Sequence, residues 1–288
     1  MPMKPMKKQQ TRSFPLCSWW RSLSTIKRIC AGICLFYLLV AIFGPALAPY
    51  PADDFSSPSL LAPSWEHLLG TDEMGHDIFS MLLQGFRLSL TVSIIAGGGS
   101  TLLGTLLAFA SCYFPRVGGL IRHLANLLLI VPEMVVILFV ATFAAPTMTN
   151  TVLAIIFFSW PRVFRIAYGK ILGCMGKNKV QYTLLMGGNL PDVARKVWRD
   201  LYPVFGTLLV LQCNRAVTYE TTLSFFGIGD PLLKTWGRLI RSALNYENFF
   251  YDNTYLWYLV PAMVCVVGFV VSLSILMFDE DQREDDCT

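Results

Sequence analysis

Charged residues are scarce in this 288-residue sequence. Asp, Glu, Lys and Arg make up 15% of the chain, whereas hydrophobic residues make up 54%. Soluble domains average about 25% charged residues, and apolar runs of about 20 residues are typical of membrane-spanning helices. The composition therefore argues against a soluble domain and predicts an integral membrane protein that crosses the bilayer several times.

The sequence also lacks the common motifs of hydrolytic and metal chemistry. It contains no Walker P-loop, no HExxH and no GxSxG, and its eight cysteines include no CxxC pair. We therefore expect no catalytic residues, no cofactor and no metal site, and any ATP hydrolysis must occur on another polypeptide. The formal net charge of +4 does not indicate nucleic-acid binding, because the basic residues fall in particular loops.

Six apolar blocks are long enough to cross a bilayer. They cover residues 28–48, 89–113, 119–145, 149–168, 203–226 and 256–278. We predict an all-α integral membrane fold of six transmembrane helices. Along the chain, we expect a cytoplasmic leader (1–27), the first helix (28–48) and an external acidic loop (49–86). A core of the other five helices (87–278) follows, which includes a polar loop (170–203), and the chain continues into an acidic tail (279–288).

Lysine and arginine are distributed unevenly, which predicts the orientation. The leader and the 170–203 loop are rich in both, whereas residues 49–86 contain neither. Because basic loops are retained on the cytoplasmic side, we predict that both termini and the 170–203 loop are cytoplasmic. This loop also contains the pair Gly187 and Gly188 and a proline, Pro191, which we interpret as a helix stop.

Small residues recur every four positions in the second apolar block. They are Ala96, Ser100, Gly104, Ala108 and Cys112. Close backbone contact over small residues supplies much of the packing between helices in lipid. We therefore predict that this stripe faces the other helices of the bundle.

Polar side chains inside the predicted spans are candidates for a transport path. Glu133 lies in the third block, and Gln212, Arg215, Tyr219 and Glu220 lie in the fifth. A charge at the bilayer centre costs about 2.5–3.5 kcal/mol, so such groups normally face partners or a wet cavity. Two interpretations stay open: a face that lines a translocation path, or a structural network in which Arg215 pairs with Glu220 or Glu133.

Residues 70–90, GTDEMGHDIFSMLLQGFRLSL, resemble the GTDxxGRDxxSRLLxGxRxSL signature of the inner-membrane permeases of dipeptide, oligopeptide and nickel ABC importers. The motif residues are Gly70, Thr71, Asp72, Gly75 and Asp77, with His76 where the family has arginine. Residues 44–55, 159–172 and 222–240 also resemble this family, in the same order along the chain.

The resemblance implies a type I ABC importer permease fold and a set of partners. These are a second permease subunit, two cytoplasmic ATPases, an external substrate-binding protein and membrane lipid, with no nucleic acid. It also implies that this chain forms half of a path for di- or oligopeptides, or for nickel or other metal complexes. ATP hydrolysis then takes place on the partner subunits.

The family couples to its ATPase through a cytoplasmic loop with the motif EAAxxxG, followed by IxLP. Two alignments are open here. If Gly187 is the motif glycine, Gln181, Tyr182 and Thr183 occupy the EAA positions, and the gap to Leu201-Tyr202-Pro203 is three residues too long. If the spacing from Pro203 is kept, Leu190 replaces the glycine and 184–186 replace EAA. Because the acidic residue is missing in both, a non-transporting structural or regulatory subunit is the alternative function.

Overall fold

The computed structural model describes residues 24–187, 190–246 and 253–277, and its regular structure is helical throughout these ranges. The helices are α2 (Thr25–Leu47), α3 (Ile78–Tyr113), α4 (Pro115–Ile130), α5 (Glu133–Phe143), α6 (Met148–Met175), α7 (Asn178–Leu185), α8 (Leu190–Phe225), α9 (Trp236–Asn245) and α10 (Tyr255–Met277). Most of the leader (1–23) and the acidic tail lie outside the described residues.

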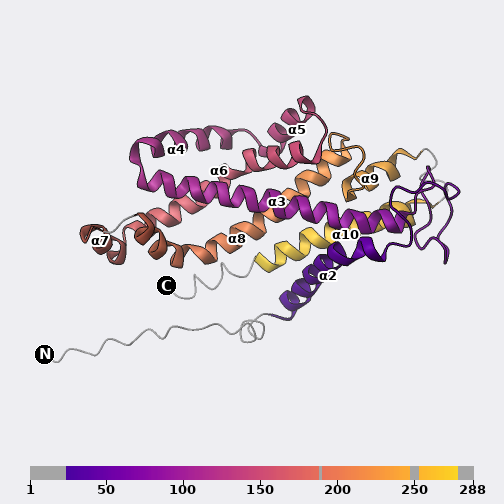
Figure 1. The fold of residues 1–288 in the computed structure, drawn as a ribbon, viewed down its shortest axis with the longest axis horizontal. Helices are drawn as coiled ribbons and strands as arrows, with labels where there is room; N and C mark the ends of the chain where they lie inside the picture. The colour runs from indigo at the N-terminus through magenta and orange to yellow at the C-terminus, as the bar shows by residue number, and fades with distance from the viewer. Residues whose placement is uncertain (1–23, 188–189, 247–252, 278–288) are drawn as a thin grey trace.

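Helix α3 lies at the centre of the bundle, between α6 and α8 (Figure 1). Four members of the predicted small-residue stripe are buried, and the fifth, Cys112, is partly buried. A Cβ atom added to Gly104 would lie 2.7 Å from the carbonyl oxygen of Trp160 on α6, and one added to Gly97 would lie 2.6 Å from the backbone nitrogen of Cys213 on α8. The stripe is therefore confirmed as a surface of close helix contact, and Gly97 extends it.

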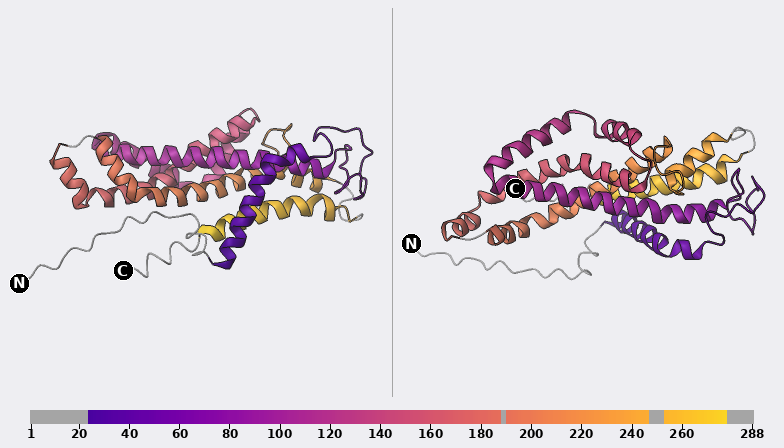
Figure 2. Two further views of the ribbon diagram at one scale, coloured as in Figure 1. Left: turned by 60° about the horizontal axis from the view of Figure 1, so that its bottom comes forward. Right: turned by 45° about the horizontal axis from the view of Figure 1, so that its top comes forward.

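Helices α2 and α10 pack at one side of α3, where α2 crosses α10 (Figure 2). Aromatic rings fill this junction: the ring centroids of Phe86 and Trp236 are 5.0 Å apart, as are those of Tyr37 and Phe86. The Tyr37 hydroxyl donates a hydrogen bond of 2.9 Å to the carbonyl oxygen of Cys265 on α10. The contacts of Trp236 hold the amphipathic helix α9, which carries it, against α10 and the first part of α3.

Four helices, α2, α3, α6 and α10, are long and apolar enough to cross a membrane, and α4 with α5 forms a fifth candidate if the bent pair counts as one span. This count covers the described residues only. The predicted third block, 119–145, is not one straight helix: the axes of α4 and α5 differ by 89°. The break falls at Val131–Pro132, where proline has no backbone N–H to continue the helical hydrogen bonds.

Helices α3 and α8 begin well before the predicted apolar blocks. Helix α3 begins at Ile78 because Asp77 caps it, so the end of the predicted external loop is helical. Helix α8 begins at Leu190, and Figure 1 shows its first turns set at an angle to the rest of the helix. Pro191 therefore lies in the first turn of a helix, which tolerates proline, and our interpretation of it as a helix stop was wrong.

Candidate functional site

The motif of residues 70–77 lies in the loop between α2 and α3, at the end of the bundle opposite to α7 (Figure 1). Gly70 and Gly75 have φ angles of +74° and +86°. A side chain at either position would also collide with a backbone carbonyl oxygen, that of Leu61 or Ser57. The two glycines are therefore required by the path of the loop backbone.

The polar residues of this motif bond to the loop itself. The Thr71 hydroxyl donates to the carbonyl oxygen of Pro58 at 2.7 Å and accepts from the backbone nitrogen of Leu61 at 2.8 Å. The Asp72 carboxylate accepts from the backbone nitrogens of Met74 and His76, each at 2.8 Å. These side chains hold the turn closed rather than project from it.

Asp77 joins the loop to helix α3. One carboxylate oxygen accepts from the backbone nitrogen and the hydroxyl of Ser80, at 2.8 and 2.7 Å. The other lies 3.0 Å from Nδ1 of buried His67. His76, which replaces the family's arginine, lies 3.0 Å from Asp72 and 3.4 Å from the Nζ atom of Lys234. A cation beside this site thus comes from Lys234, close in space but distant in sequence.

The segment 170–203 folds into a helical hairpin. Helix α6 continues to Met175, α7 follows, and α8 returns from Leu190. Val180 of α7 is fully buried in one hydrophobic cluster with Val193, Val197 and Leu201 of α8. These α8 residues recur every four positions and so share one face of the helix, which fixes α7 against the base of α8.

Charges reinforce this packing at the edge of the hairpin. Asp200 of α8 lies 2.9 Å from the Nζ atom of Lys177 and 2.7 Å from that of Lys179. The hydrogen bonds from Lys177 and Lys179 lower the pKa of Asp200 to about 2, and the same bond to Asp200 raises the pKa of Lys177. The Thr183 hydroxyl also accepts a hydrogen bond from Lys196 of α8.

Gly187 follows α7 with a φ angle of +76°, in the left-handed region that favours glycine after a helix. This geometry favours the alignment in which Gly187 is the motif glycine, since Leu190 of the other alignment begins α8. Gly188 lies outside the described residues. Pro203 is an exposed residue inside α8.

The C-terminal end of α7 exposes apolar side chains on the face that turns away from α8. The exposed fractions are 66% for Tyr182, 81% for Leu185 and 89% for Met186, and Gln181 beside them is also exposed. Val180 and the ion pairs with Asp200 attach α7 to α8, so these exposed side chains have a defined position relative to α8. We call Tyr182, Leu185 and Met186 the apolar tip of α7.

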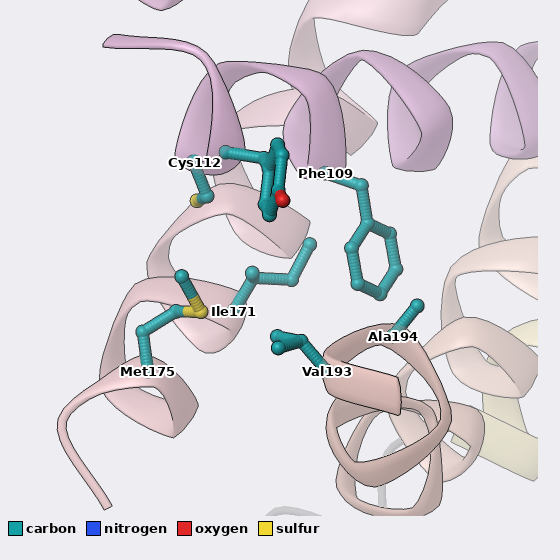
Figure 3. A pocket seen from close by; sticks show the side chains of 7 residues that line it. Phe109, Cys112, Ile171, Met175, Val193 and Ala194 are labelled. Carbon is teal, nitrogen blue, oxygen red and sulfur yellow. The ribbon is translucent and has the colours of Figure 1, made fainter. Parts of the chain in front are cut away.

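A small hollow lies behind the hairpin, between the ends of α3 and α6 and the start of α8 (Figure 3). Apolar side chains from all three helices line it, among them Phe109, Ile171 and Val193. The lining is mainly apolar, so we interpret the hollow as a packing gap where three helix ends diverge.

In the middle of the bundle, polar side chains from α5, α6 and α8 converge on Glu133. One carboxylate oxygen lies 3.4 Å from Nη2 of Arg162 and 3.9 Å from Nη1 of Arg215. The other accepts a hydrogen bond from the Ser159 hydroxyl. Tyr219 lies within hydrogen-bonding reach of the same carboxylate. We call Glu133, Arg162, Arg215, Ser159 and Tyr219 the mid-span cluster.

The structure places the other two candidate path residues next to different partners. The Gln212 side chain is buried and donates to the carbonyl oxygen of Ser159 at 3.4 Å, at the edge of the mid-span cluster. The Glu220 carboxylate is also buried, but it accepts from Ser89 at 3.2 Å and from Ser224 at 2.7 Å. Of the two pairings considered for Arg215, the structure has the one with Glu133.

Ser159 and Arg162 were missing from our list of candidate path residues. Arg162 is a closer partner of Glu133 than Arg215 is. A signal was available: Glu133 and Arg162 are opposite charges within neighbouring apolar blocks, and buried charges in lipid seek each other.

The chain also matches a protein-family model. Residues 100–283, more than half of the chain, match the model described as "Binding-protein-dependent transport system inner membrane component". The chain belongs to this family. It is a permease component of an ABC importer and a multi-pass protein of the bacterial inner membrane.

Named relatives of the permease are peptide transporters. It is 30% identical over 247 residues to the "Di/tripeptide transport system permease protein DppC" of Pseudomonas aeruginosa (strain UCBPP-PA14), which covers 81% of this chain and 80% of the relative. It is 26% identical over 261 residues to the "Peptide transport system permease protein SapC" of Escherichia coli O6:H1, with 86% and 82% covered. A "Dipeptide transport system permease protein DppC" of Alkalihalophilus pseudofirmus is 25% identical over 284 residues, with 96% and 89% covered. The resemblance noted in the sequence motifs is confirmed.

Proposed function

We propose that this permease is one of two membrane subunits of a peptide importer. We also propose that α7 contacts a cytoplasmic ATPase and transmits the movements of the ATPase to the membrane helices. The family depends on a substrate-binding protein, and such a protein would deliver cargo at the loop between α2 and α3. The relatives named above transport di- and tripeptides or peptides, which favours peptides over nickel or metal complexes as cargo.

Six spans with both termini in the cytoplasm remain our proposal for the topology. The bent pair α4 and α5 would form the third span, and the part of α8 from residue 203 onward would form the fifth. The charge distribution supports this orientation, because the hairpin around α7 is rich in lysine and arginine whereas residues 49–86 contain none.

The apolar tip of α7 is the observation that carries the coupling proposal. Tyr182, Leu185 and Met186 are more than half exposed at the basic end of the bundle, outside the apolar part of α6. Exposed apolar patches of this kind usually mark a protein contact. Since Val180 and Asp200 fix α7 to α8, a force applied to the tip would reach the base of a spanning helix.

Co-purification from the native membrane tests this docking. We expect wild-type permease to retain its ATPase, and Leu185→Asp to lose it because a carboxylate replaces an apolar contact. Gly187→Val should lose it as well, since a β-branched residue does not tolerate the left-handed conformation. Trp65→Asp is the matched control: Trp65 is 97% exposed, but it lies in the loop at the other end of the bundle.

Two results would count against the proposal. If Leu185→Asp and Gly187→Val both retain the ATPase and normal uptake, α7 is not the docking element. If the wild-type permease assembles with a second permease but never with an ATPase, the subunit has a structural or regulatory role instead.

A further inference from the structure

The mid-span cluster contains more cations than anions. Two guanidinium groups, Arg162 and Arg215, share the single carboxylate of Glu133. The remaining neighbours, Ser159, Tyr219 and Gln212, contribute hydroxyl and amide groups without charge. With Glu133 ionised, the cluster therefore carries one excess positive charge.

Both arginines lie well inside the proposed spans. Cys174 of α6 contacts Asp200 of α8 at 3.7 Å, which brings the bases of the two helices to one level. Arg162 lies twelve residues before Cys174, and Arg215 lies fifteen residues after Asp200. At 1.5 Å per residue, Arg162 is about 18 Å and Arg215 about 22 Å from that level. With that level at one edge of a hydrocarbon core of about 30 Å, both fall inside the core.

Glu133 does not satisfy this pair of arginines. Nε of Arg162 and Nη1 of Arg215 are buried and have no hydrogen-bond acceptor among the described residues. At the same time, 40% of the Arg162 side chain and 27% of the Arg215 side chain are exposed, against 8% for Glu133. The carboxylate is enclosed, whereas part of each arginine side chain is exposed.

We do not expect the exposed parts of these arginines to face lipid, because the energetic cost of a charge in hydrocarbon is high. They face the path or the second permease. A planar guanidinium recognises a carboxylate through two parallel hydrogen bonds, and this contact is stronger than one between neutral groups.

We propose that Arg162 and Arg215 bind the C-terminal carboxylate of a peptide as it passes through the permease. This inference rests on the proposed function, since it assigns the path to these helices and a peptide to the path. Glu133 orients the two guanidinium groups through its ion pairs with them. The carboxylate of the peptide would therefore bind to arginine side chains that are already in position. A peptide whose C-terminus is neutral lacks the group that this site recognises.

Uptake of two matched peptides tests the assignment. The assembled importer, with its binding protein and ATPases, is placed in liposomes, and uptake of trialanine is compared with uptake of trialanine amide. The acid-to-amide ratio is the readout. Because the same binding protein serves every variant, a change in this ratio between variants arises in the permease.

We expect the wild-type complex to prefer the acid, and Arg162→Gln with Arg215→Gln to lower the ratio roughly tenfold, the effect of losing one charge-assisted hydrogen bond. Glu133→Gln should raise the ratio instead, since it frees both guanidinium groups for the substrate. A folding defect would not produce changes in opposite directions. Arg165→Gln, an exposed arginine on the same helix, should leave the ratio unchanged.

The failures are distinguishable. If the wild type imports trialanine but the ratio is the same in all variants, the arginine assignment is overturned and the pair serves the second permease or the bundle. If the assembled wild-type complex imports neither peptide, the peptide importer and the arginine site are both rejected.

Discussion

Asp200 on α8 lies 2.7 Å from the Nζ atom of Lys179 on α7, which makes one carboxylate the electrostatic attachment between two helices of the hairpin. Lys177 reaches the same carboxylate at 2.9 Å. All three side chains are at least partly open to water, so the contact is screened and modest in strength.

Removing this carboxylate should loosen α7. In Asp200→Asn, hydrogen exchange of the backbone amides of α7 should rise by roughly twofold to fivefold, the range expected for an exposed ion pair. Mass spectrometry of peptides covering 178–185 measures it. Arg199→Gln is the control, because it removes a charge from the adjacent position of α8. Equal exchange in Asp200→Asn and wild type would show that Val180 alone holds the helix.

Acid should have the same effect as that substitution. Hydrogen bonds from Lys177 and Lys179 lower the pKa of Asp200 to about 2, below the ordinary carboxyl value of about 3.9. The ionised Asp200 carboxylate therefore contributes its full stabilisation of α7 packing above about pH 4, and this stabilisation is lost as the pH falls through about 2. Spin labels at positions 182 and 199, in a background without exposed cysteines, should give a narrow distance distribution at pH 5–8 that broadens in this acidic window. In Asp200→Asn, the width should not change with pH.

Gly104→Ala should destabilise the contact between α3 and α6. The added Cβ would lie 2.7 Å from the carbonyl oxygen of Trp160 and from Cβ of Val163, so the helices must separate. Overpacking of this kind costs about 1–3 kcal/mol and should lower the melting temperature in detergent. Gly169→Ala on α6 is the matched control, since a Cβ there meets no atom within 4 Å. Its effect should be neutral or stabilising, because alanine favours a helix.

Asp77→Ala should destabilise the start of α3. The substitution removes the cap at Ser80 and the partner of His67, at a cost of about 1–2 kcal/mol for the cap alone. The melting temperature should fall by several degrees. Asp54→Ala, which loses only a bond to the exposed backbone nitrogen of Ser56, should change it little. A melting point equal to that of the wild type would contradict the role given to Asp77.

Hydropathy predicted the straight helices well. The blocks 28–48 and 256–278 correspond within a few residues to α2 and α10, because an unbroken apolar run has no competing signal. The same signal missed the bend at Val131–Pro132, where apolar residues continue on both sides. It also missed α9, whose apolar residues occupy only one face of a short helix.

The site was predicted less completely, for a physical reason. Position in a span identified Glu133, Arg215 and Tyr219, but pairing depends on how α5, α6 and α8 are turned about their axes. That rotation placed Glu220 beside Ser89 and Arg162 beside Glu133. The length of α8 was likewise underestimated, since Val193, Val197 and Leu201 form a buried stripe inside a segment of polar composition.

Because the chain bends just before Glu133, the angle between α4 and α5 determines whether this carboxylate lies beside the two arginines. Pro132 has no N–H to donate back to α4, so this residue contributes no backbone hydrogen bond that would join α4 and α5 into one helix. With α5 in its present position, the carboxylate cancels one of the two arginine charges. A swing that carried Glu133 away would leave both uncancelled and double the excess positive charge that a passing anion meets. The angle between α4 and α5 would then set the net charge of the mid-span cluster, and with it the strength of anion binding in the path.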